Sequence, residues 1–196
     1  MFANRYTAFI DACSLVDTLR RNFLLTLGEA EFFRLRWSDK VLEETEVTIE
    51  RLLTERGKSD ARERALRSIR QMKAAFPEAL VTDFSNFEEK NCPLPDENDA
   101  HVLGAALKAQ AQAIVTENLK DFPATVLHPR NLEARSADDF IADTIALDTG
   151  RAIKAVRKMR ERLRRPEKTP DVLLRDCEAR GLLATAAQLK PFIELI

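Results

Sequence analysis

A chain of 196 residues is long enough for one ordinary domain, or for one domain with an appendage. Apolar residues make up 45% of it, which suffices for a core, and the net charge of −1 favours no class of partner by itself. No window approaches the roughly 18 apolar residues that a membrane helix needs, and the N-terminus lacks the apolar stretch of a signal peptide. We therefore expect a cytoplasmic protein with no membrane partner.

The cysteines and histidines leave little room for a soft metal site. Cys13, Cys92 and Cys177 are widely spaced and form no CxxC motif, which is typical of reduced thiols in the cytosol. The two histidines, His101 and His128, each stand alone. Any metal ion in this protein is therefore expected to be held by oxygen atoms.

Short apolar segments alternate with helical patterns over the first 135 residues. We predict core strands at 6–10 and 113–116, shorter strands at 35–37 and 79–81, and a last strand at 125–128. The predicted helices between them span 13–22, 27–33, 38–56, 60–75 and 96–109. Strands that alternate with helices favour an α/β fold in which a parallel sheet is covered on both faces.

Beyond residue 135 the pattern predicts helices and no strands. Ser136 opens a sequence like a capping box, and Thr169 followed by Pro170 is a strong helix start that Gly181 can close. We therefore divide the chain into an α/β domain at 1–135 and an all-helical C-terminal extension at 136–196.

Four acidic residues are candidates for a functional site: Asp11, Glu44, Asp99 and Asp121. In an open parallel sheet, ligands lie beyond the carboxyl ends of the strands. Asp11 directly follows the first core strand, and Asp121 lies a few residues past the second one. Both are expected at the same edge, although each could instead cap a helix or turn a loop.

Asp99 lies on the apolar stripe of its predicted helix, together with Val102, Leu103 and Ala106. A carboxylate on a buried stripe needs a partner, because burying an unpaired charge is very costly. The alternative is a capping box in which Asp96 caps the helix and Asp99 reaches back to it.

The helix predicted at 38–56 carries three glutamates close together, Glu43, Glu44 and Glu46. Its apolar stripe centres between Val41 and Ile49, and Glu43 points away from that stripe. Glu44 and Glu46 flank the stripe on opposite sides, so periodicity does not choose between them. A solvated helix face remains the alternative for either one.

The four acids together are stronger evidence for a metal site than any one of them alone. Three or four carboxylates with no matching lysine, arginine or histidine motif repel one another, so such a group is suited to divalent cations. Mg²⁺ prefers a few carboxylates together with water and phosphate oxygens. Two such ions can activate a water and stabilise the leaving oxygen of a phosphodiester. We therefore predict a site for divalent cations such as Mg²⁺.

These residues resemble four motifs of the PIN-domain nucleases. Residues 8–14 resemble the opening strand, which delivers the first metal-binding acid and is followed by a small polar residue. Residues 38–45, 96–106 and 114–122 are similar to the second, third and fourth motifs. The resemblance implies catalytic acids at Asp11, Glu44, Asp99 and Asp121, metal binding by Asp11, Asp99, Asp121 and the accessory Asp96, and support from Ser14, Thr116 and Asn118.

The resemblance covers about residues 5–135, with the motifs in the family's order and spacing. Many relatives carry Asp where this chain has Asn118, which shifts the role of the fourth acid onto Asp121. A three-layer α/β/α fold and cleavage of RNA that depends on Mg²⁺ or Mn²⁺ are implied. At this size the chain resembles the VapC-type toxins of bacterial toxin–antitoxin pairs, which implies a small antitoxin protein as partner and a homodimer.

Two features leave alternatives open. Residues 151–168 contain nine basic and two acidic residues, a pattern that fits RNA phosphate contacts by Arg157, Arg160 and Arg164, and equally a solvated face or an acidic partner. The acids also fit a housekeeping PIN nuclease of RNA processing. A receiver-like signalling domain ranks lower, because only one Asp follows the first strand, and a non-catalytic binding module remains possible.

Overall fold

The computed structural model describes residues 6–88, 93–164 and 167–196. Within these ranges five parallel strands form one sheet in the order β3-β2-β1-β4-β5. The strands are β1 (Thr7–Ile10), β2 (Arg34–Ser38), β3 (Leu80–Val81), β4 (Ala113–Val115) and β5 (Glu133–Arg135). The central strand β1 is buried over its whole length, as expected for a parallel strand covered on both faces.

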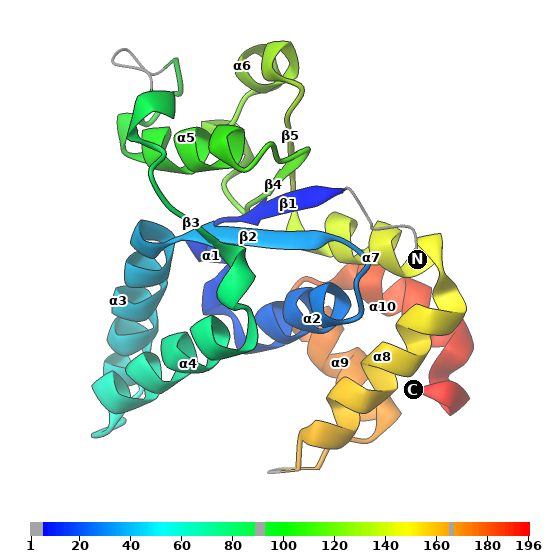
Figure 1. The fold of residues 1–196 in the computed structure, drawn as a ribbon. Coiled ribbons are helices and arrows are strands. Elements are labelled where there is room, and N and C mark those ends of the chain that lie inside the picture. The colour runs from blue at the N-terminus through cyan, green and yellow to red at the C-terminus, as the bar shows by residue number, and fades with distance from the viewer. Residues whose placement is uncertain (1–5, 89–92, 165–166) are drawn as a thin grey trace.

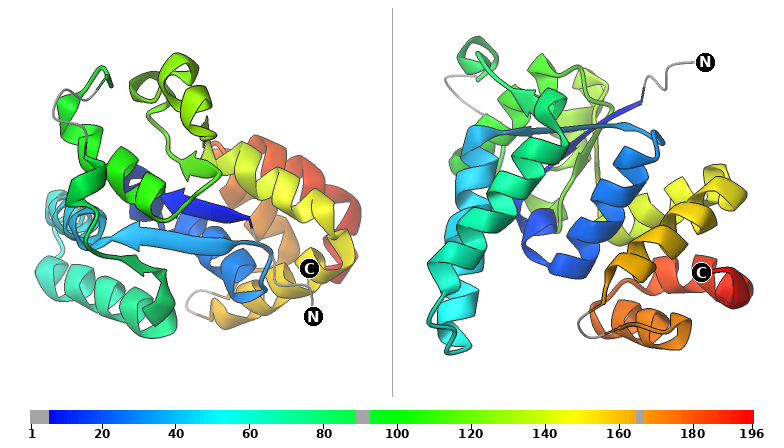
Figure 2. Two further views of the ribbon diagram at one scale, coloured as in Figure 1. Left: turned by 45° about the horizontal axis from the view of Figure 1, so that its top comes forward. Right: turned by 60° about the horizontal axis from the view of Figure 1, so that its bottom comes forward.

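Helices cover both faces of the sheet (Figure 1). One side carries α5 (Ala100–Lys108) and α6 (Ala124–Leu127), and the other carries α1 (Ala12–Val16), α2 (Thr18–Glu29), α3 (Asp39–Glu55) and α4 (Ala61–Ala75) (Figures 1 and 2). The predicted three-layer α/β/α architecture is confirmed. No helix in the described ranges is long and apolar enough to span a membrane.

The predicted bounds of the first two helices are wrong. The chain breaks at Asp17, whose backbone is extended, instead of continuing to residue 22. The carboxylate of Asp17 accepts hydrogen bonds from the backbone N–H groups of Leu19 (3.0 Å) and Arg20 (2.9 Å), so it starts the longer helix α2. Because α2 then runs on to Glu29, no separate helix forms at 27–33.

The predicted strand at 125–128 is also wrong. Residues 124–127 form the helix α6, in which the carbonyl of Pro123 accepts from the N–H of Val126 (2.9 Å). A short apolar run fits a helical turn as well as a strand, so the pattern alone did not distinguish them. The edge strand is instead β5, which pairs with β4.

Among the described residues the extension folds as four α-helices and a terminal 3-10 helix: α7 (Ala137–Leu147), α8 (Thr149–Arg162), α9 (Pro170–Ala179), α10 (Leu183–Leu189) and η6 (Lys190–Leu195). The predicted caps are present, since the hydroxyl of Ser136 accepts from the N–H of Asp139 and that of Thr169 from Val172. The basic residues at 151–168 do not lie on one helix, because α8 ends at Arg162. Arg164 lies beyond it, in an isolated bridge with Glu167.

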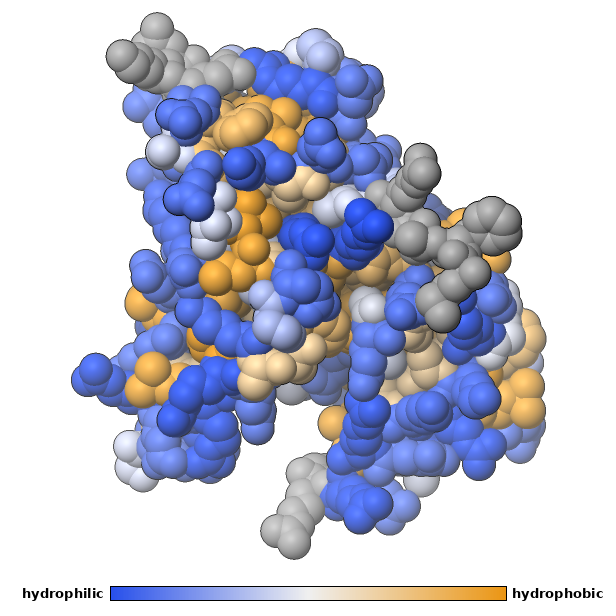
Figure 3. Space-filling view, viewed as in Figure 1, coloured by the Kyte–Doolittle hydropathy of each residue, from blue (hydrophilic) through white to orange (hydrophobic). Residues whose placement is uncertain are grey.

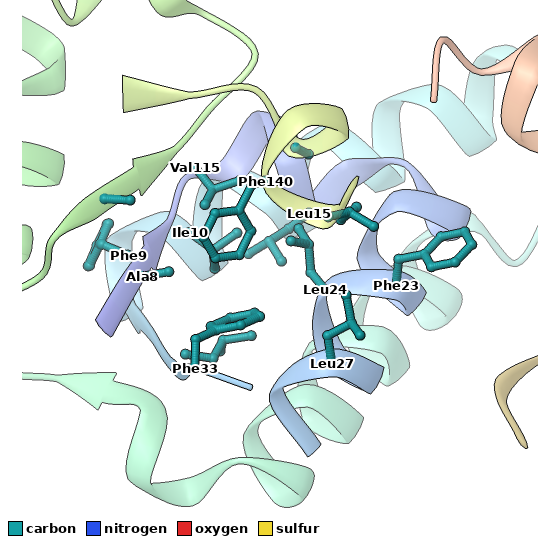
Figure 4. Packing of buried hydrophobic residues seen from close by; sticks show 14 of the residues in the cluster. Ala8, Phe9, Ile10, Leu15, Phe23, Leu24, Leu27, Phe33, Val115 and Phe140 are labelled. Carbon is teal, nitrogen blue, oxygen red and sulfur yellow. The ribbon is translucent and has the colours of Figure 1, made fainter. Parts of the chain in front are cut away.

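The extension and the sheet share one hydrophobic cluster. Phe140 of α7 packs edge-on against Phe33 with ring centroids 4.8 Å apart, and it lies close to Ile10 and Val115 of the central strands (Figure 4). The division of the chain at residue 135 therefore stays a prediction, because packing is continuous across it.

Candidate functional site

Asp11 is fixed by three donors at the carboxyl end of β1. Its side chain is 6% exposed. One carboxylate oxygen accepts from the N–H of Ala12 (2.7 Å), and the other accepts from the hydroxyl of Thr116 (2.8 Å) and the thiol of Cys13 (3.0 Å). Asp11 is the N-cap of α1, so the alternative of a helix cap is correct as far as it goes. The hydrogen bonds from Thr116 and Cys13 are additional, because a cap does not need them. They hold the carboxylate in one orientation.

Thr116 connects two of the motifs. It is fully buried at the end of β4, and its hydroxyl both donates to Asp11 and accepts from the N–H of Asn118 (3.1 Å). The side chain of Asn118 is exposed. Ser14 is fully buried and donates its N–H to the carbonyl of Asp11 (3.1 Å). Its hydroxyl has no hydrogen-bond partner among the described residues, so its support is through the backbone.

Asp99 is half-buried directly before α5, and the capping box considered for it does not form. Asp96 accepts from the N–H of Asn98 (2.9 Å), whereas Asp99 makes no capping side-chain bond in the described part of the chain. Burial, followed by the charges of Asp11, Asp96 and Asp121, raises the pKa of Asp99 to about 6. Carboxylates from separate segments of the chain therefore lie near enough to Asp99 to disfavour its charged form.

The two candidate glutamates of α3 differ in their surroundings. Glu44 lies 3.1 Å from the Nε2 atom of His101, measured from its Oε1 atom, and His101 is buried on the first turn of α5. No ion pair or hydrogen bond is seen for the side chain of Glu46 within the described ranges. Since His101 comes two residues after Asp99, Glu44 is the glutamate that lies beside the acids.

Sequence reasoning missed two residues of this site, Cys13 and His101. The thiol of Cys13 lies 3.2 Å from the hydroxyl of Thr116 and accepts from the N–H of Glu117 (3.1 Å). Burial, followed by the charge of Asp11, raises the pKa of Cys13 to about 12, so the group is a neutral donor to Asp11. In the sequence, only the position of Cys13 two residues after Asp11 indicated that it could belong to the site. Nothing in the sequence indicated this for His101.

The chemistry of the donors fits a hard divalent cation. Within the described ranges no lysine or arginine forms an ion pair with Asp11, Asp99 or Asp121, and carboxylate oxygens are the ligands that Mg²⁺ and Mn²⁺ prefer. In the same ranges no group of three histidine, cysteine or acidic side chains is already close enough to hold an ion. Binding would therefore require the half-buried acids to turn inward.

The structure does not bring the predicted RNA-binding arginines to the acids. Arg157 pairs with Glu161 (2.9 Å), and Arg160 donates to the carbonyl of Lys168 (2.8 Å). The arrowheads of β1 and β2 point toward α3, whereas α8 lies on the opposite side (Figure 2, left). The surface over α8 is mainly hydrophilic (Figure 3).

A parallel sheet with acids at its carboxyl edge and helices on both faces defines a three-layer α/β domain. A family model described as the PIN domain matches residues 7–120, which is over half of the chain, so the chain belongs to the PIN domain family. A second model, described as the VapC50 C-terminal domain, matches residues 137–191.

A curated relative carries the same name as that second domain. The chain is 47% identical over 49 residues to the protein named “Putative ribonuclease VapC50” from Mycobacterium tuberculosis (strain ATCC 25618 / H37Rv). The matched stretch covers 25% of this chain and 29% of that protein. No solved structure matches the chain.

Proposed function

We propose that this chain is a divalent-metal-dependent endoribonuclease and the toxin of a type II toxin–antitoxin pair. The observation that supports this most is the group of acids at the carboxyl edge of a PIN-family sheet, where burial and the charges of Asp11, Asp96 and Asp121 raise the pKa of Asp99. The similarity to the VapC50 C-terminal domain and to a protein named as a ribonuclease favours the toxin over a housekeeping nuclease.

In this proposal Asp11, Asp99 and Asp121 hold the ion, with Asp96 as the accessory acid and Glu44 completing the catalytic set. A bound Mg²⁺ or Mn²⁺ ion supplies a water of lowered pKa and neutralises charge on the phosphate. Thr116 and Cys13 orient the Asp11 carboxylate, and the backbone of Asn118 orients the Thr116 hydroxyl in turn.

Metal dependence is tested with purified protein and labelled single-stranded RNA. We expect cleavage with Mg²⁺ or Mn²⁺, none in EDTA, and recovery when the metal is restored, because a divalent cation would neutralise the repulsion among the acids and bind the phosphate. Asp121→Asn is the inactive reference. Cleavage that persists in EDTA after exhaustive metal removal would contradict the proposal.

The toxin role is tested in cells. Expression of the chain should arrest growth, Asp121→Asn should not, and co-expression of a small protein encoded next to it should restore growth by forming a complex. A housekeeping nuclease would cut RNA in vitro, but its expression would not arrest growth. The same purification tests the proposed homodimer by light scattering, and cell fractionation tests the proposed cytoplasmic location.

RNA contact by Arg157, Arg160 and Arg164 stays a proposal, and it requires an RNA long enough to run from the acids to α8. Reversal of Arg157 and Arg164 to Glu should then weaken binding and flatten its salt dependence. Arg160 is a poor member of that set, because it is largely buried and bonds to the carbonyl of Lys168.

A further inference from the structure

Beneath the acids lies a cavity of about 230 Å³ at which three parts of the chain meet. Its walls come from α1 and the start of α2, from the C-terminal half of α3 and from the end of α9. Among its described lining residues are three arginines: Arg20 of α2, Arg56 at the end of α3, and Arg180 at the end of α9. Residues from both the sheet domain and the extension therefore form it, and we call it the arginine pocket.

The charges of the arginine pocket are only partly compensated. Arg180 pairs with Asp17, and Arg20 lies 3.2 Å from the carboxylate of Glu117. Arg56 is exposed and forms no ion pair among the described residues. The Nε atom of Arg20 is buried and has no partner within the same ranges. Three guanidinium groups thus face two carboxylates, which leaves donors available for an anion.

The arginine pocket adjoins the acids through a single residue. Cys13 lines the pocket, and its sulfur lies 3.0 Å from the Oδ2 atom of Asp11. A nucleic acid strand whose scissile phosphate lies at Asp11 must continue past it in both directions. Because Cys13 both contacts Asp11 and lines the pocket, the pocket is the basic site that adjoins Asp11, whereas α8 lies toward the other end of the strands (Figure 2, left).

Resting on the proposed nuclease function, we propose that the arginine pocket binds a backbone phosphate of the RNA next to the scissile one. Guanidinium groups bind phosphate through paired N–H donors, and they are the side chains best suited to that geometry. The extension contributes Arg180 to this site, so it is part of the substrate-binding surface. An acidic segment of a partner protein is the competing occupant, and the test below distinguishes it from RNA.

The test measures RNA binding apart from cleavage. Binding of a short fluorescent single-stranded RNA of mixed sequence is followed by anisotropy in EDTA over a range of salt concentrations. Arg56→Gln and Arg180→Gln should each weaken binding several-fold and reduce the salt slope by about 0.7, the value for one lost contact to a single strand. Arg70→Gln is the matched control, since Arg70 is exposed on α4, outside the pocket, and the same charge is lost.

A variant with the opposite expectation separates binding from folding damage. Asp17→Asn keeps an acceptor for the N–H groups of Leu19 and Arg20 but releases Arg180, so RNA binding should become tighter. Thermal melts of all variants show whether the fold is intact. A variant with a mere folding defect would not bind RNA more tightly.

The outcomes distinguish this proposal from the nuclease function. If Arg56→Gln and Arg180→Gln bind RNA as Arg70→Gln does while the wild type still cuts it, the pocket proposal is overturned and the nuclease stands. If the wild type binds RNA through these arginines but never cuts it with Mg²⁺ or Mn²⁺, the nuclease function fails instead. Weakened binding of the antitoxin with unchanged RNA binding would assign the pocket to the partner protein and overturn the proposal.

Discussion

At the scale of single residues, the orientation of Asp11 is the central feature of the site. Its carboxylate accepts from a backbone N–H, a hydroxyl and a thiol, while the other acids are half-buried or exposed. One acid is therefore fixed before any ligand arrives, and Asp99 and Asp121 have freedom to adjust. We therefore expect substitutions at Asp11 and at Asp121 to differ in their effect on stability.

Thr116→Val keeps the shape of the side chain and removes the hydroxyl. Asp11 loses a donor and the N–H of Asn118 loses its acceptor, so unfolding should become easier by about 1–3 kcal/mol. Cleavage should fall more than RNA binding, because Asp11 is no longer held in place. Thr116→Ser is the control and should restore most of both. A Val variant as active as wild type would remove Thr116 from the positioning role.

Asp121→Asn should abolish cleavage without lowering the metal-free melting temperature. Asp121 is one of the charges, after burial and after Asp11 and Asp96, that raise the pKa of Asp99, so its removal relieves repulsion. Mg²⁺ should raise the wild-type melting temperature by mass action and raise that of the variant less. The readout is a thermal melt with and without Mg²⁺ beside a cleavage assay. An Asp121→Asn protein that is active but melts well below wild type would show that Asp121 has a structural role and no catalytic one.

Asp11→Asn should differ from Asp121→Asn in stability. An amide at this position turns one acceptor oxygen into a donor that faces the hydroxyl of Thr116 and the thiol of Cys13. The metal-free melting temperature should therefore fall, while cleavage is lost in both variants. Equal melting temperatures for the two variants would mean that the hydrogen bonds to Asp11 contribute little.

At the scale of elements, Asp17 ends α1 and caps α2. Its ion pair with Arg180 also links the end of α9 to these two helices. Burial raises the pKa of Asp17, but hydrogen bonds from the backbone of Arg20 and the charge of Arg180 outweigh that effect and hold the pKa below its ordinary value of 3.8. A depressed carboxyl pKa stabilises the fold above the unfolded-state pKa, and this contribution disappears as the pH falls through the folded-state pKa.

Asp17→Ala should therefore cost about 0.5–2 kcal/mol of stability at neutral pH through the lost cap. The difference between wild type and Asp17→Ala should shrink as the pH falls below about 4, because the unfolded chain then binds a proton at Asp17 while the folded protein binds it only at its lower pKa. Denaturant melts at pH 7 and pH 3 measure this difference. Asp171→Ala is the control, because Asp171 is exposed and its side chain forms no hydrogen bond or ion pair among the described residues. A difference that does not change with pH would exclude the ionised carboxylate as its cause.

At the scale of the whole molecule, the extension completes the core. Phe140 and Ile141 of α7 are 4% and 0% exposed, and they belong to the same cluster as β1 and β4. Phe140→Ala should cost about 3–5 kcal/mol. A chain ended at residue 135 would expose this face of the sheet, so we expect it to lose cooperative thermal unfolding. A sharp melt of that shorter chain would show that the domain at 1–135 folds independently.

Much of this protein follows from local sequence patterns. The strands at 6–10, 35–37, 79–81 and 113–116 were predictable because buried parallel strands are short, apolar runs between helices. Helix ends were predictable where a side chain caps its own backbone, as at Ser38 and Thr169. The order of strands and acids also placed Asp11 and Asp121 at one edge, since carboxyl ends of parallel strands share an edge.

Other features depend on contacts between distant segments. Glu44 and Glu46 are equivalent by helical periodicity, and only the packing of α3 near His101 of α5 distinguishes them. Cys13 joins the site because β4 brings Thr116 and Glu117 beside it, and Arg180 reaches the arginine pocket because α9 folds back onto Asp17. The sequence by itself determined four of the five strands and the side-chain caps at Ser38, Ser136 and Thr169, because these depend on near neighbours. Only the tertiary structure decided which charges meet, because that depends on how helices far apart in the chain pack on the sheet.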